Sequence, residues 1–195
     1  AAYMPLHHVG SIPVQVRDAF LQAQRELRPV VLGAPLDLQD EQWPGAVSWP
    51  APAYRIRPEI GPLPPHSDDI ERALSVIRPA RRIVIIAGLG AARSDAASAC
   101  QALALRVGGL LATTLPARGL FAGDEFSLGV AGGFASVLAR VLLPQAYLVI
   151  AVGMRLALHN ADGGTLLSAV KVLHIDIEPL AVSQGWVAAT HHLRA

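Results

Sequence analysis

The stretch RIVIIAGLGAAR, Arg82–Arg93, decides the fold class of this chain. It opens with Ile83–Ile86, a run of four apolar and β-branched residues. A run of this length and composition is typical of a parallel strand that is buried on both faces. Two glycines, Gly88 and Gly90, follow the run and predict a tight turn at the end of the strand.

A helix is predicted directly after this turn. Apolar residues recur at helical spacing over Ala96–Val107, and Ser94 and Asp95 are the expected N-cap residues. Three later segments have the composition of buried strands and alternate with further helical spacing: Leu110–Thr114, Ala146–Val152 and Lys171–Ile177. This alternation predicts an α/β fold with a doubly wound, mostly parallel, Rossmann-like sheet. A last strand is expected near Trp186–Ala188, and Leu115–Val130 is expected to be a loop.

The glycine turn does not complete the fingerprint of a dinucleotide-binding site. That fingerprint is G-x-G-x-x-G, and its sixth position, counted from Gly88, is Arg93 here. The strand Leu110–Thr114 also lacks the acidic residue that binds a ribose hydroxyl in NAD-dependent dehydrogenases. Both features argue against an ordinary NAD-dependent dehydrogenase. Gly88 and Gly90 therefore have two interpretations: they expose N–H groups to an anionic ligand, or they only let the helix pack closely on the strand.

The composition indicates a folded protein with a large apolar interior. Of the 195 residues, 52% are hydrophobic and 16% are charged, and the formal net charge is +1. These values exclude a disordered chain, and the lack of a basic stripe argues against a nucleic-acid partner. The longest apolar region, Ala135–Val152, is interrupted by Arg140 and Pro144, so we expect no membrane span. The single cysteine, Cys100, excludes an internal disulfide and favours a cytoplasmic location.

The first third of the chain is predicted to lie outside the main domain. A helix is expected over Ile12–Arg28 and a short buried strand over Val30–Pro35. One helix and one strand cannot close a hydrophobic core, so residues 1–38 are interpreted as the C-terminal remnant of a preceding α/β domain. Residues 39–66 are rich in proline and are predicted to be a linker that lies along a surface. Residues 67–195 are predicted to form the central domain.

The segments, taken in order, resemble the thiamine diphosphate-dependent enzymes of the acetolactate synthase and pyruvate decarboxylase group. RPVVLGAPLDLQ, residues 28–39, is similar to the end of their first, pyrimidine-binding domain. Five later stretches follow the order of their central domain: RRIVIIAGLGAARSDA, LLATTLPARGLF, LGVAGG, AYLVIAVGMRL and VLHIDIEP. The resemblance implies that this chain is the central, largely structural domain of an enzyme that acts on 2-keto acids as a carboligase or a decarboxylase.

The resemblance also implies what this chain lacks. In the family, a glutamate of the first domain activates thiamine diphosphate, and a Gly-Asp-Gly motif of the third domain binds its magnesium diphosphate. The chain contains no Gly-Asp-Gly, and the nearest string, Gly123-Asp124-Glu125, stands in another context. It is therefore expected to hold no catalytic residue or metal ligand, and to bind neither thiamine diphosphate nor Mg2+ alone. Its expected partners are the missing pyrimidine- and pyrophosphate-binding domains, in a full enzyme that forms a homodimer or homotetramer.

In some members of the family the central domain holds FAD or ADP at the carboxyl ends of its strands. The positions of this chain that match such a site are Gly88, Gly90, Thr113, Thr114, Gly153, Arg155 and Asp176. The match is incomplete, because no glycine-rich continuation follows TTL, no His-Gly follows LGVAGG, and no acidic pair follows GMR. Three interpretations stay open: FAD, ADP or a coenzyme A-type nucleotide, or a structural domain without a ligand. The alternative outside the family is a non-enzymatic FAD- or ADP-binding module, such as the flavin domain of an electron-transfer flavoprotein.

Histidines give two weaker signals. His174 and Asp176 are two residues apart on a predicted strand and therefore face one side of it, as two metal ligands would. No third ligand has a recognisable spacing, so we expect both side chains to serve packing and hydrogen bonding. The pair His191-His192 lies near the end of the chain and is expected to be solvated.

Overall fold

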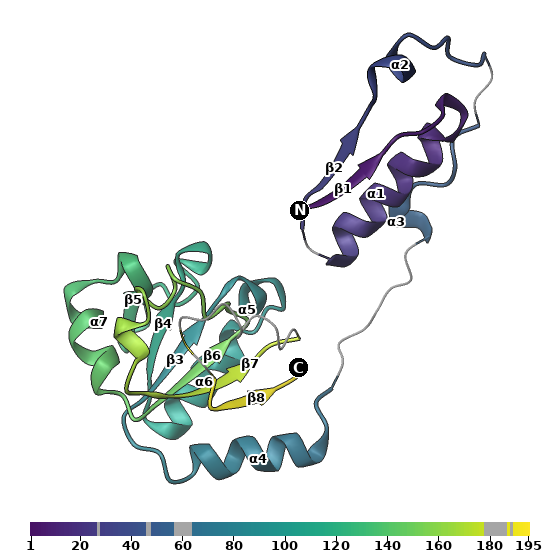
Figure 1. Ribbon diagram of the computed structural model, residues 1–195. Coiled ribbons are helices and arrows are strands. Elements are labelled where there is room, and N and C mark those ends of the chain that lie inside the picture. Colours follow the sequence, from purple (N-terminus) through teal and green to yellow (C-terminus); the bar gives the residue numbers. More distant parts are fainter. Residues whose placement is uncertain (27, 46–47, 57–63, 178–186, 188) are drawn as a thin grey trace. The chain divides into compact units, whose positions relative to one another are not determined.

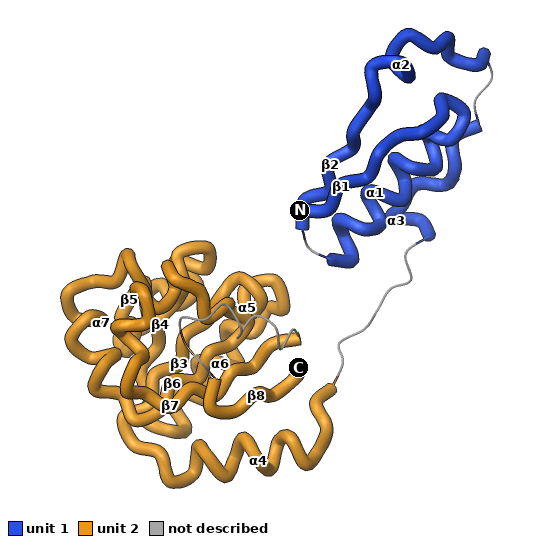
Figure 2. The backbone as a smooth tube through the Cα atoms, in the orientation of Figure 1, with its two compact units in different colours: residues 1–61 blue, residues 62–195 orange. Residues whose placement is uncertain are grey.

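The structure is a computed structural model that describes residues 1–26, 28–45, 48–56, 64–177, 187 and 189–195. The chain divides into two compact units, residues 1–61 and 62–195 (Figure 2). Each unit has its own sheet and its own helices. Across the described residues, no helix has both the length and the apolar composition that crossing a bilayer requires.

Among its described residues, the larger unit is built on one parallel sheet of six strands (Figure 1). In space the strands follow the order β5-β4-β3-β6-β7-β8. Their bounds are β3 Ile83–Ala87, β4 Leu110–Thr113, β5 Ser127–Val130, β6 Leu148–Val152, β7 Lys171–Ile175 and β8 His191–Leu193. The helices are α4 Ser67–Ile77, α5 Leu89–Arg93, α6 Ala97–Val107 and α7 Val137–Leu142, with short 3₁₀ turns at Leu115–Ala117, Gly132–Phe134, Leu143–Gln145 and Thr165–Leu167. The arrangement confirms the predicted α/β fold with a parallel sheet.

The sheet is doubly wound because the chain reverses its direction of travel between β3 and β6. From β3 the chain passes to β4 and β5 on one side, and it then returns to β6, β7 and β8 on the other side. Ile85 in the middle of β3 lies opposite Leu111 of β4 and opposite Ile150 of β6. In open α/β sheets, ligands bind at the carboxyl ends of the strands where the order reverses. A ligand site is therefore expected at the ends of β3 and β6.

Both faces of the sheet are covered, as the apolar run Ile83–Ile86 predicts. Every residue of β3 is buried, and Ile85 and Ile150 have no exposed surface. One face packs against residues of α4, α5 and α6, and the other packs against α7 and the turns at Leu143–Gln145 and Thr165–Leu167. Cys100 of α6 lies in the first of these two cores, and burial raises the pKa of its thiol.

The helix after the glycine turn begins earlier than predicted. Helix α5 starts at Leu89, directly after Gly88, and a second helix, α6, starts at Ala97. Ser94 and Asp95, expected as N-cap residues, instead separate the two helices, and no side chain caps α6. Asp95 has a left-handed backbone with a φ of 52°. Aspartate tolerates this region better than most residues, which explains why a residue typical of helix caps stands at this break.

Strand β5 corrects the prediction of a loop over Leu115–Val130. It lies at the edge of the sheet and pairs only with β4. Of its four residues only Leu128 is buried, and Gly129 has a φ of 76°. An edge strand with one buried residue and a left-handed glycine has no continuous apolar run, so the sequence carries no strand pattern here.

Strand β8 forms the opposite edge of the sheet and pairs with β7. The expectation that His191-His192 is solvated is wrong, because both side chains are partly buried in this strand. Its three residues are too few to show alternation, and Leu193 is its only buried residue. Most of the strand expected near Trp186–Ala188 lies outside the described residues.

The described part of the smaller unit contains a two-stranded parallel sheet and three α-helices. The strands are β1 Ala2–Pro5 and β2 Val30–Gly33, the helices are α1 Ile12–Glu26, α2 Leu36–Gln39 and α3 Ala53–Ile56, and a 3₁₀ turn spans Val9–Ser11. Strand β1 is not predicted from the sequence, because AYMP is short and ends in proline. Leu6, Val9 and Leu38 form a small core cluster in this unit, and Ala19 and Ala53 are also buried.

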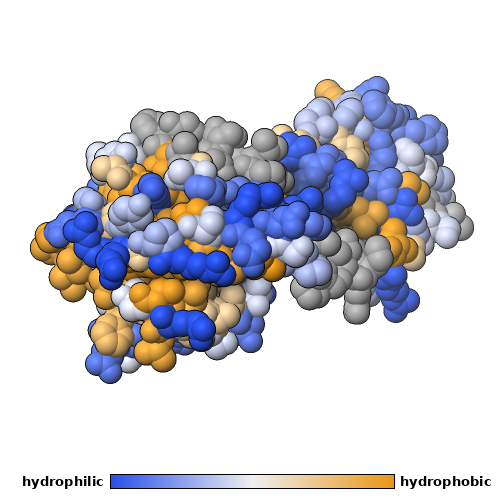
Figure 3. All heavy atoms as spheres, turned by 90° about the horizontal axis from the view of Figure 1, so that it is seen from below, coloured by the Kyte–Doolittle hydropathy of each residue, from blue (hydrophilic) through white to orange (hydrophobic). Residues whose placement is uncertain are grey.

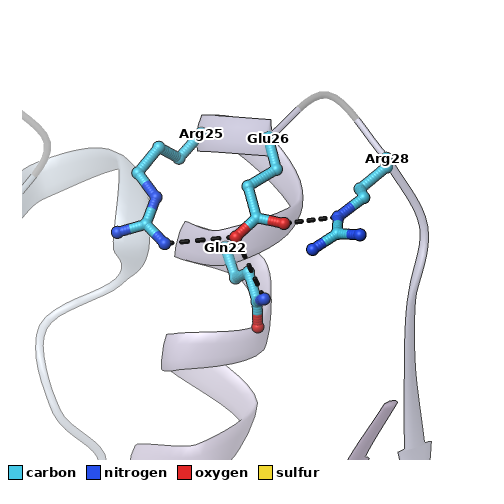
Figure 4. A network of polar contacts seen from close by, with 4 residues as sticks. All are labelled: Gln22, Arg25, Glu26 and Arg28. Atoms are coloured by element: carbon cyan, nitrogen blue, oxygen red, sulfur yellow. Dashed lines mark hydrogen bonds and ion pairs between the residues drawn. The ribbon is translucent and has the colours of Figure 1, made fainter. Parts of the chain in front are cut away.

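Helix α1 ends in a polar network around Glu26 (Figure 4). The Glu26 carboxylate accepts hydrogen bonds from Gln22 at 3.1 Å, from Arg25 at 3.2 Å and from Arg28 beyond the helix. The hydrogen bond from Arg28 is the largest cause of a lowered pKa at Glu26. The described helix thus ends before Arg28, the predicted last residue, and Arg28 binds the terminal carboxylate instead.

A groove of about 540 Å³ runs beside α1 within the smaller unit. Its walls include Val16 and Phe20 of α1, together with Trp49 and Tyr54 from the proline-rich segment. The rings of Trp43 and Trp49 are stacked, with 6.4 Å between their centroids. The structure therefore divides the chain at residue 61 and places most of the expected linker with the first unit. The assignment of residues 1–38 to a preceding domain stays a prediction.

The division into units predicts that residues 62–195 fold without the rest of the chain. Both faces of the six-stranded sheet are covered from within this segment, whereas a two-stranded sheet is marginally stable by itself. A fragment of residues 62–195 should therefore keep a cooperative transition in differential scanning calorimetry. A fragment of residues 1–61 should show none. A non-cooperative transition of the larger fragment would place the boundary elsewhere.

Candidate functional site

The carboxyl ends of strands β3, β4, β6 and β7 lie along one side of the larger sheet, which we call the carboxyl edge. The predicted site residues lie at or directly after these ends. Gly88 follows β3, Thr113 ends β4, Gly153 follows β6 and Asp176 follows β7. The strands are parallel and in register, so these ends lie side by side (Figure 1). The structure thus brings the residues to one edge, where their contacts decide what each can bind.

The glycines of this edge allow two backbone segments to approach very closely. The N–H of Gly90 donates to the carbonyl oxygen of Gly153 at 2.8 Å, and the N–H of Gly88 donates to Val152 at 2.8 Å. A Cβ atom at Gly88 would clash with the carbonyl oxygen of Gly153, and one at Gly153 would clash with the N–H nitrogen of Ala91. Gly153 also has a φ of 57°, a region that side chains disfavour. Any residue larger than glycine would therefore separate the turns after β3 and β6.

This packing also occupies the backbone donors of the three glycines, which a phosphate would otherwise bind. A phosphate-binding turn presents free N–H groups at the start of a helix. Here the N–H groups of Gly88 and Gly90 bind carbonyl oxygens, and the N–H of Gly153 donates to Ile175 at 2.8 Å. Of the two interpretations of the turn, this geometry favours close packing. A role of these glycines in binding a nucleotide stays a prediction.

Thr113 and Thr114 are buried where β4 ends. The N–H of Thr114 donates to Ala87 at 2.9 Å, and the carbonyl oxygen of Thr113 accepts from the N–H of Ala131 at 2.8 Å. Their backbone therefore joins β4 to β3 on one side and to the segment after β5 on the other. The two side chains are the only buried hydroxyl groups among the described residues, and they stand at the predicted ligand edge.

Arg155 is exposed and lies at the start of the loop that follows β6, and hydrogen bonds from other residues fix this loop. Its carbonyl oxygen accepts a hydrogen bond from the Asn160 side chain at 2.7 Å. Further along, Arg140 of α7 binds Asp162 at 2.5 Å and the carbonyl oxygen of Gly133 at 2.8 Å. The loop after β6 is thus fixed to α7, while the Arg155 guanidinium has no ion pair among the described residues.

His174 lies in β7 and Asp176 directly follows this strand; the two residues are two positions apart and face the same side. The Nε2 atom of His174 lies 2.8 Å from the carbonyl oxygen of Met154 and 3.7 Å from an Asp176 carboxylate oxygen. His174 is fully buried, and this burial is the main cause of its lowered pKa. Within the described ranges, no three ligand-type side chains gather where a metal ion could be held. The contacts therefore support packing and hydrogen bonding rather than a metal site at this pair.

The close approach of the two turns predicts a specific loss of stability for Gly153→Ala. Gly108 is a matched control, because its φ of 61° is similar to the 57° of Gly153 but its surroundings are open. Gly108→Ala should cost about 1–2 kcal/mol, from the left-handed backbone alone. Gly153→Ala should cost about 1–3 kcal/mol more, the usual range for overpacking. Urea denaturation of both variants measures the difference, and equal losses would show that the turns can separate freely.

Comparison with known proteins gives a family for this arrangement. Residues 70–190 match the family model described as "Thiamine pyrophosphate enzyme, central domain". This span begins in α4 and takes in strands β3 to β7, which include the whole of the candidate edge.

Several acetolactate synthases are similar to this chain along most of its length. The large subunit from Corynebacterium glutamicum is 30% identical over 183 residues, which cover 90% of this chain and 28% of the relative. Acetolactate synthase from Mycobacterium bovis is 31% identical, with 89% and 28% covered. Chloroplastic acetolactate synthase 2 from Zea mays is 29% identical, with 91% and 28% covered. The chain thus spans little more than a quarter of the length of these relatives.

The fold has a counterpart among solved structures. A protein from Mycobacterium smegmatis, assigned to the thiamin diphosphate-dependent enzymes, matches 98% of this chain and 36% of its own chain, with a TM-score of 0.66 and 19% identity. At this identity the likeness concerns the fold alone, whereas the family match covers more than half of the sequence. The chain belongs to the thiamine pyrophosphate enzymes, and the part that matches is their central domain.

Proposed function

We propose that this chain is the central, largely structural domain of a thiamine diphosphate-dependent enzyme that acts on 2-keto acids as a carboligase or a decarboxylase. The observation that carries the proposal is the family match over residues 70–190, which contains most of the six-stranded unit. The names of the relatives quoted above support acetolactate synthase-like chemistry within this family. Such an enzyme is a lyase or a transferase.

In this role the chain has a structural function and contributes no catalytic group. The turns after β3 and β6 are tied to each other through Gly90 and Gly153, and their donors are used within the protein. The described residues also offer no group of three acidic, histidine or cysteine side chains for a metal ion. They therefore do not fit a magnesium diphosphate, and we assign no catalytic step to them. The contribution of the domain is a rigid edge that holds neighbouring parts in place.

The coenzyme site is assigned to parts of the enzyme that this chain does not include. Thiamine diphosphate, when bound, supplies a carbanion that adds to the carbonyl group of a 2-keto acid. In our proposal, a pyrimidine-binding domain and a pyrophosphate-binding domain provide the activating carboxylate and the Mg2+ ligands. The full enzyme acts as a homo-oligomer, a dimer or a tetramer. The lone, buried Cys100 supports a reducing compartment such as the cytoplasm.

The proposal predicts that the isolated chain neither binds thiamine diphosphate nor consumes a 2-keto acid. Isothermal titration of the chain with thiamine diphosphate and Mg2+ should give no saturable heat. The acetolactate synthase of Corynebacterium glutamicum, titrated under the same conditions, is the positive control. Saturable binding in the micromolar range would mean that the described domain carries a coenzyme site and would overturn the scaffold role.

A nucleotide at the carboxyl edge is the second candidate function. It is favoured by one observation: the guanidinium of Arg155 is exposed there without an acidic partner among the described residues, while the predicted Thr113 and Thr114 lie buried at the same edge. An arginine can bind a diphosphate through two parallel hydrogen bonds. Asp176, which already has an interaction within the protein, would then lie on the ribose side of the ligand.

This second candidate predicts that a nucleotide stabilises the protein through Arg155. A thermal-shift screen with FAD, ADP, NAD and coenzyme A tests the wild type and Arg155→Ala. Loss of the guanidinium should weaken binding by roughly 1.5–3 kcal/mol, the range for a hydrogen bond to a charged group. The exposed Arg106→Ala is the control and should bind like the wild type. Equal stabilisation of all three proteins would place the ligand elsewhere, and no stabilisation would leave the scaffold as the function of this edge.

A further inference from the structure

Two histidines form a hydrogen-bonded pair between the last two strands of the larger sheet. His174 of β7 and His192 of β8 lie opposite each other in the register. Their ring centroids are 5.2 Å apart, and the two Nδ1 atoms are 3.2 Å apart. His174 is fully buried. The Nε2 atom of His192 is also shielded from solvent and has no hydrogen-bond partner among the described residues.

The contacts fix where the hydrogens of this pair lie. A carbonyl oxygen only accepts, so the Nε2 of His174 must carry the hydrogen that is donated to Met154. In a neutral ring the Nδ1 of His174 then has a lone pair. The short distance between the Nδ1 atoms therefore requires His192 to donate from its Nδ1, which leaves a lone pair on its Nε2. In the neutral pair, every ring nitrogen thus has a hydrogen-bond partner except the buried Nε2 of His192.

An added proton cannot be accommodated without cost in this geometry. If it binds the Nδ1 of His174, two N–H groups face each other across 3.2 Å unless His192 moves its own hydrogen to Nε2. If it binds His192 directly, it binds at Nε2. Every arrangement that keeps the hydrogen bond therefore places a hydrogen on the Nε2 of His192, which has no acceptor among the described residues. The strands would then hold a buried positive charge with one unsatisfied donor.

The surrounding charges only partly offset this cost. Burial is the largest influence on the pKa of His174 and lowers it, while the hydrogen bond to Met154 and the charge of Asp176 act in the opposite direction. His191 lies opposite Leu173 in the register, so it faces the other side of the sheet. On that side, the acidic residues of α4 have basic partners close to them in sequence: Asp68 with His66, Asp69 with Arg72 and Glu71 with Arg78.

Strand β8 is the element that can leave most easily. It is an edge strand of three residues and pairs only with β7, whereas β7 is paired on both sides. Beyond the three paired positions of the ladder and the histidine contact, three hydrogen bonds join the two strand regions: Asp176 N–H to Leu193 at 3.1 Å, Thr190 N–H to Val172 at 2.9 Å, and Val172 N–H to the Thr190 hydroxyl at 2.9 Å. When β8 detaches, the contact between the two imidazole rings is lost.

We propose that the His174–His192 pair is an acid-sensitive latch, which holds β8 on the sheet when it is neutral and releases it when it takes up a proton. The direction follows from linkage. The pKa of His174 lies below its ordinary value of 6.5 while the strand is attached, so the detached strand binds protons more readily. Attachment is therefore strongest above pH 6.5 and weakens as the pH falls through that value toward the lowered pKa.

Amide hydrogen exchange on the whole chain tests this latch. The amides of Asp176 and Thr190 report on the contact between β7 and β8, and the amides of Gly88 and Tyr147 report on the centre of the sheet. From about pH 7.5 to about pH 5, the protection factors of the first two should fall, because the detached strand binds protons more readily than the attached one. Those of the second two should stay constant. Equal changes at all four amides, or no change at any, would overturn the proposal.

Two variants separate the latch from other effects of acid. His192→Asn keeps an N–H donor toward His174 and can also turn its amide oxygen toward a protonated His174, so protection at Asp176 should fall less in acid than it does in the wild type. His159→Asn removes an exposed histidine of the same unit and should behave like the wild type. A His192→Asn protein whose protection at Asp176 falls in acid as much as that of the wild type would refute the latch. Should that variant fail to fold, the imidazole NMR signals of the wild type decide: the pair should accept only one proton before β8 opens, and independent titration of both rings at the ordinary histidine value would refute it.

Discussion

The larger unit depends on the burial of two neighbouring strands, β3 and β6, on both of their faces. Ile85 and Ile150 lie side by side in the register and have no exposed surface, so each needs an apolar layer above and below the sheet. Helices α4, α5 and α6 supply one layer, and α7 with the following turns supplies the other. The connections that bring these helices to opposite faces are what make the sheet doubly wound. Fold class, helix placement and the position of the candidate edge thus all follow from one run of β-branched residues.

The same two strands determine what the carboxyl edge can do. Their turns meet through Gly88, Gly90 and Gly153, and the mutual hydrogen bonds leave these backbone groups fully used. Such turns hold the two strands together, but their glycine N–H groups are not available to bind an anion. The exposed group that stays available at the edge is the side chain of Arg155, whereas Thr113 and Thr114 are buried there.

The sequence predicts the centre of this structure well and its margins poorly. Strands β3, β4 and β6 carry apolar runs, and β7 has two buried apolar residues between Lys171 and His174; each lies within or close to its predicted range. Strands β1, β5 and β8 lie at sheet edges and bury one residue at most, so they have no periodic pattern to detect. Ser94 and Asp95 mislead for another reason, since residues typical of caps also suit a left-handed break between helices. For the site, the sequence places the residues at one edge but does not reveal that the glycine donors are occupied. The pairing of His174 with His192 depends on the register of β8, which no local pattern encodes.

Helix α4 and strand β8 are the first and last elements of the larger unit, and they pack against each other (Figure 1). Ala73 of α4 and Leu193 of β8 share one core, although 120 positions separate them by number (193 − 73). Apolar surface is also exposed on this unit, where Phe134, Val137, Leu138 and Val141 reach the outside at α7; Figure 3 shows hydrophobic patches on the surface of this part. Because its first and last described elements pack together, the unit connects to the rest of a protein on one side. The surface on the opposite side is then free to vary in sequence. During evolution, such a unit can be inserted into different longer proteins. Its outer surface can then change in each protein, while the packing of α4 on β8 stays the same.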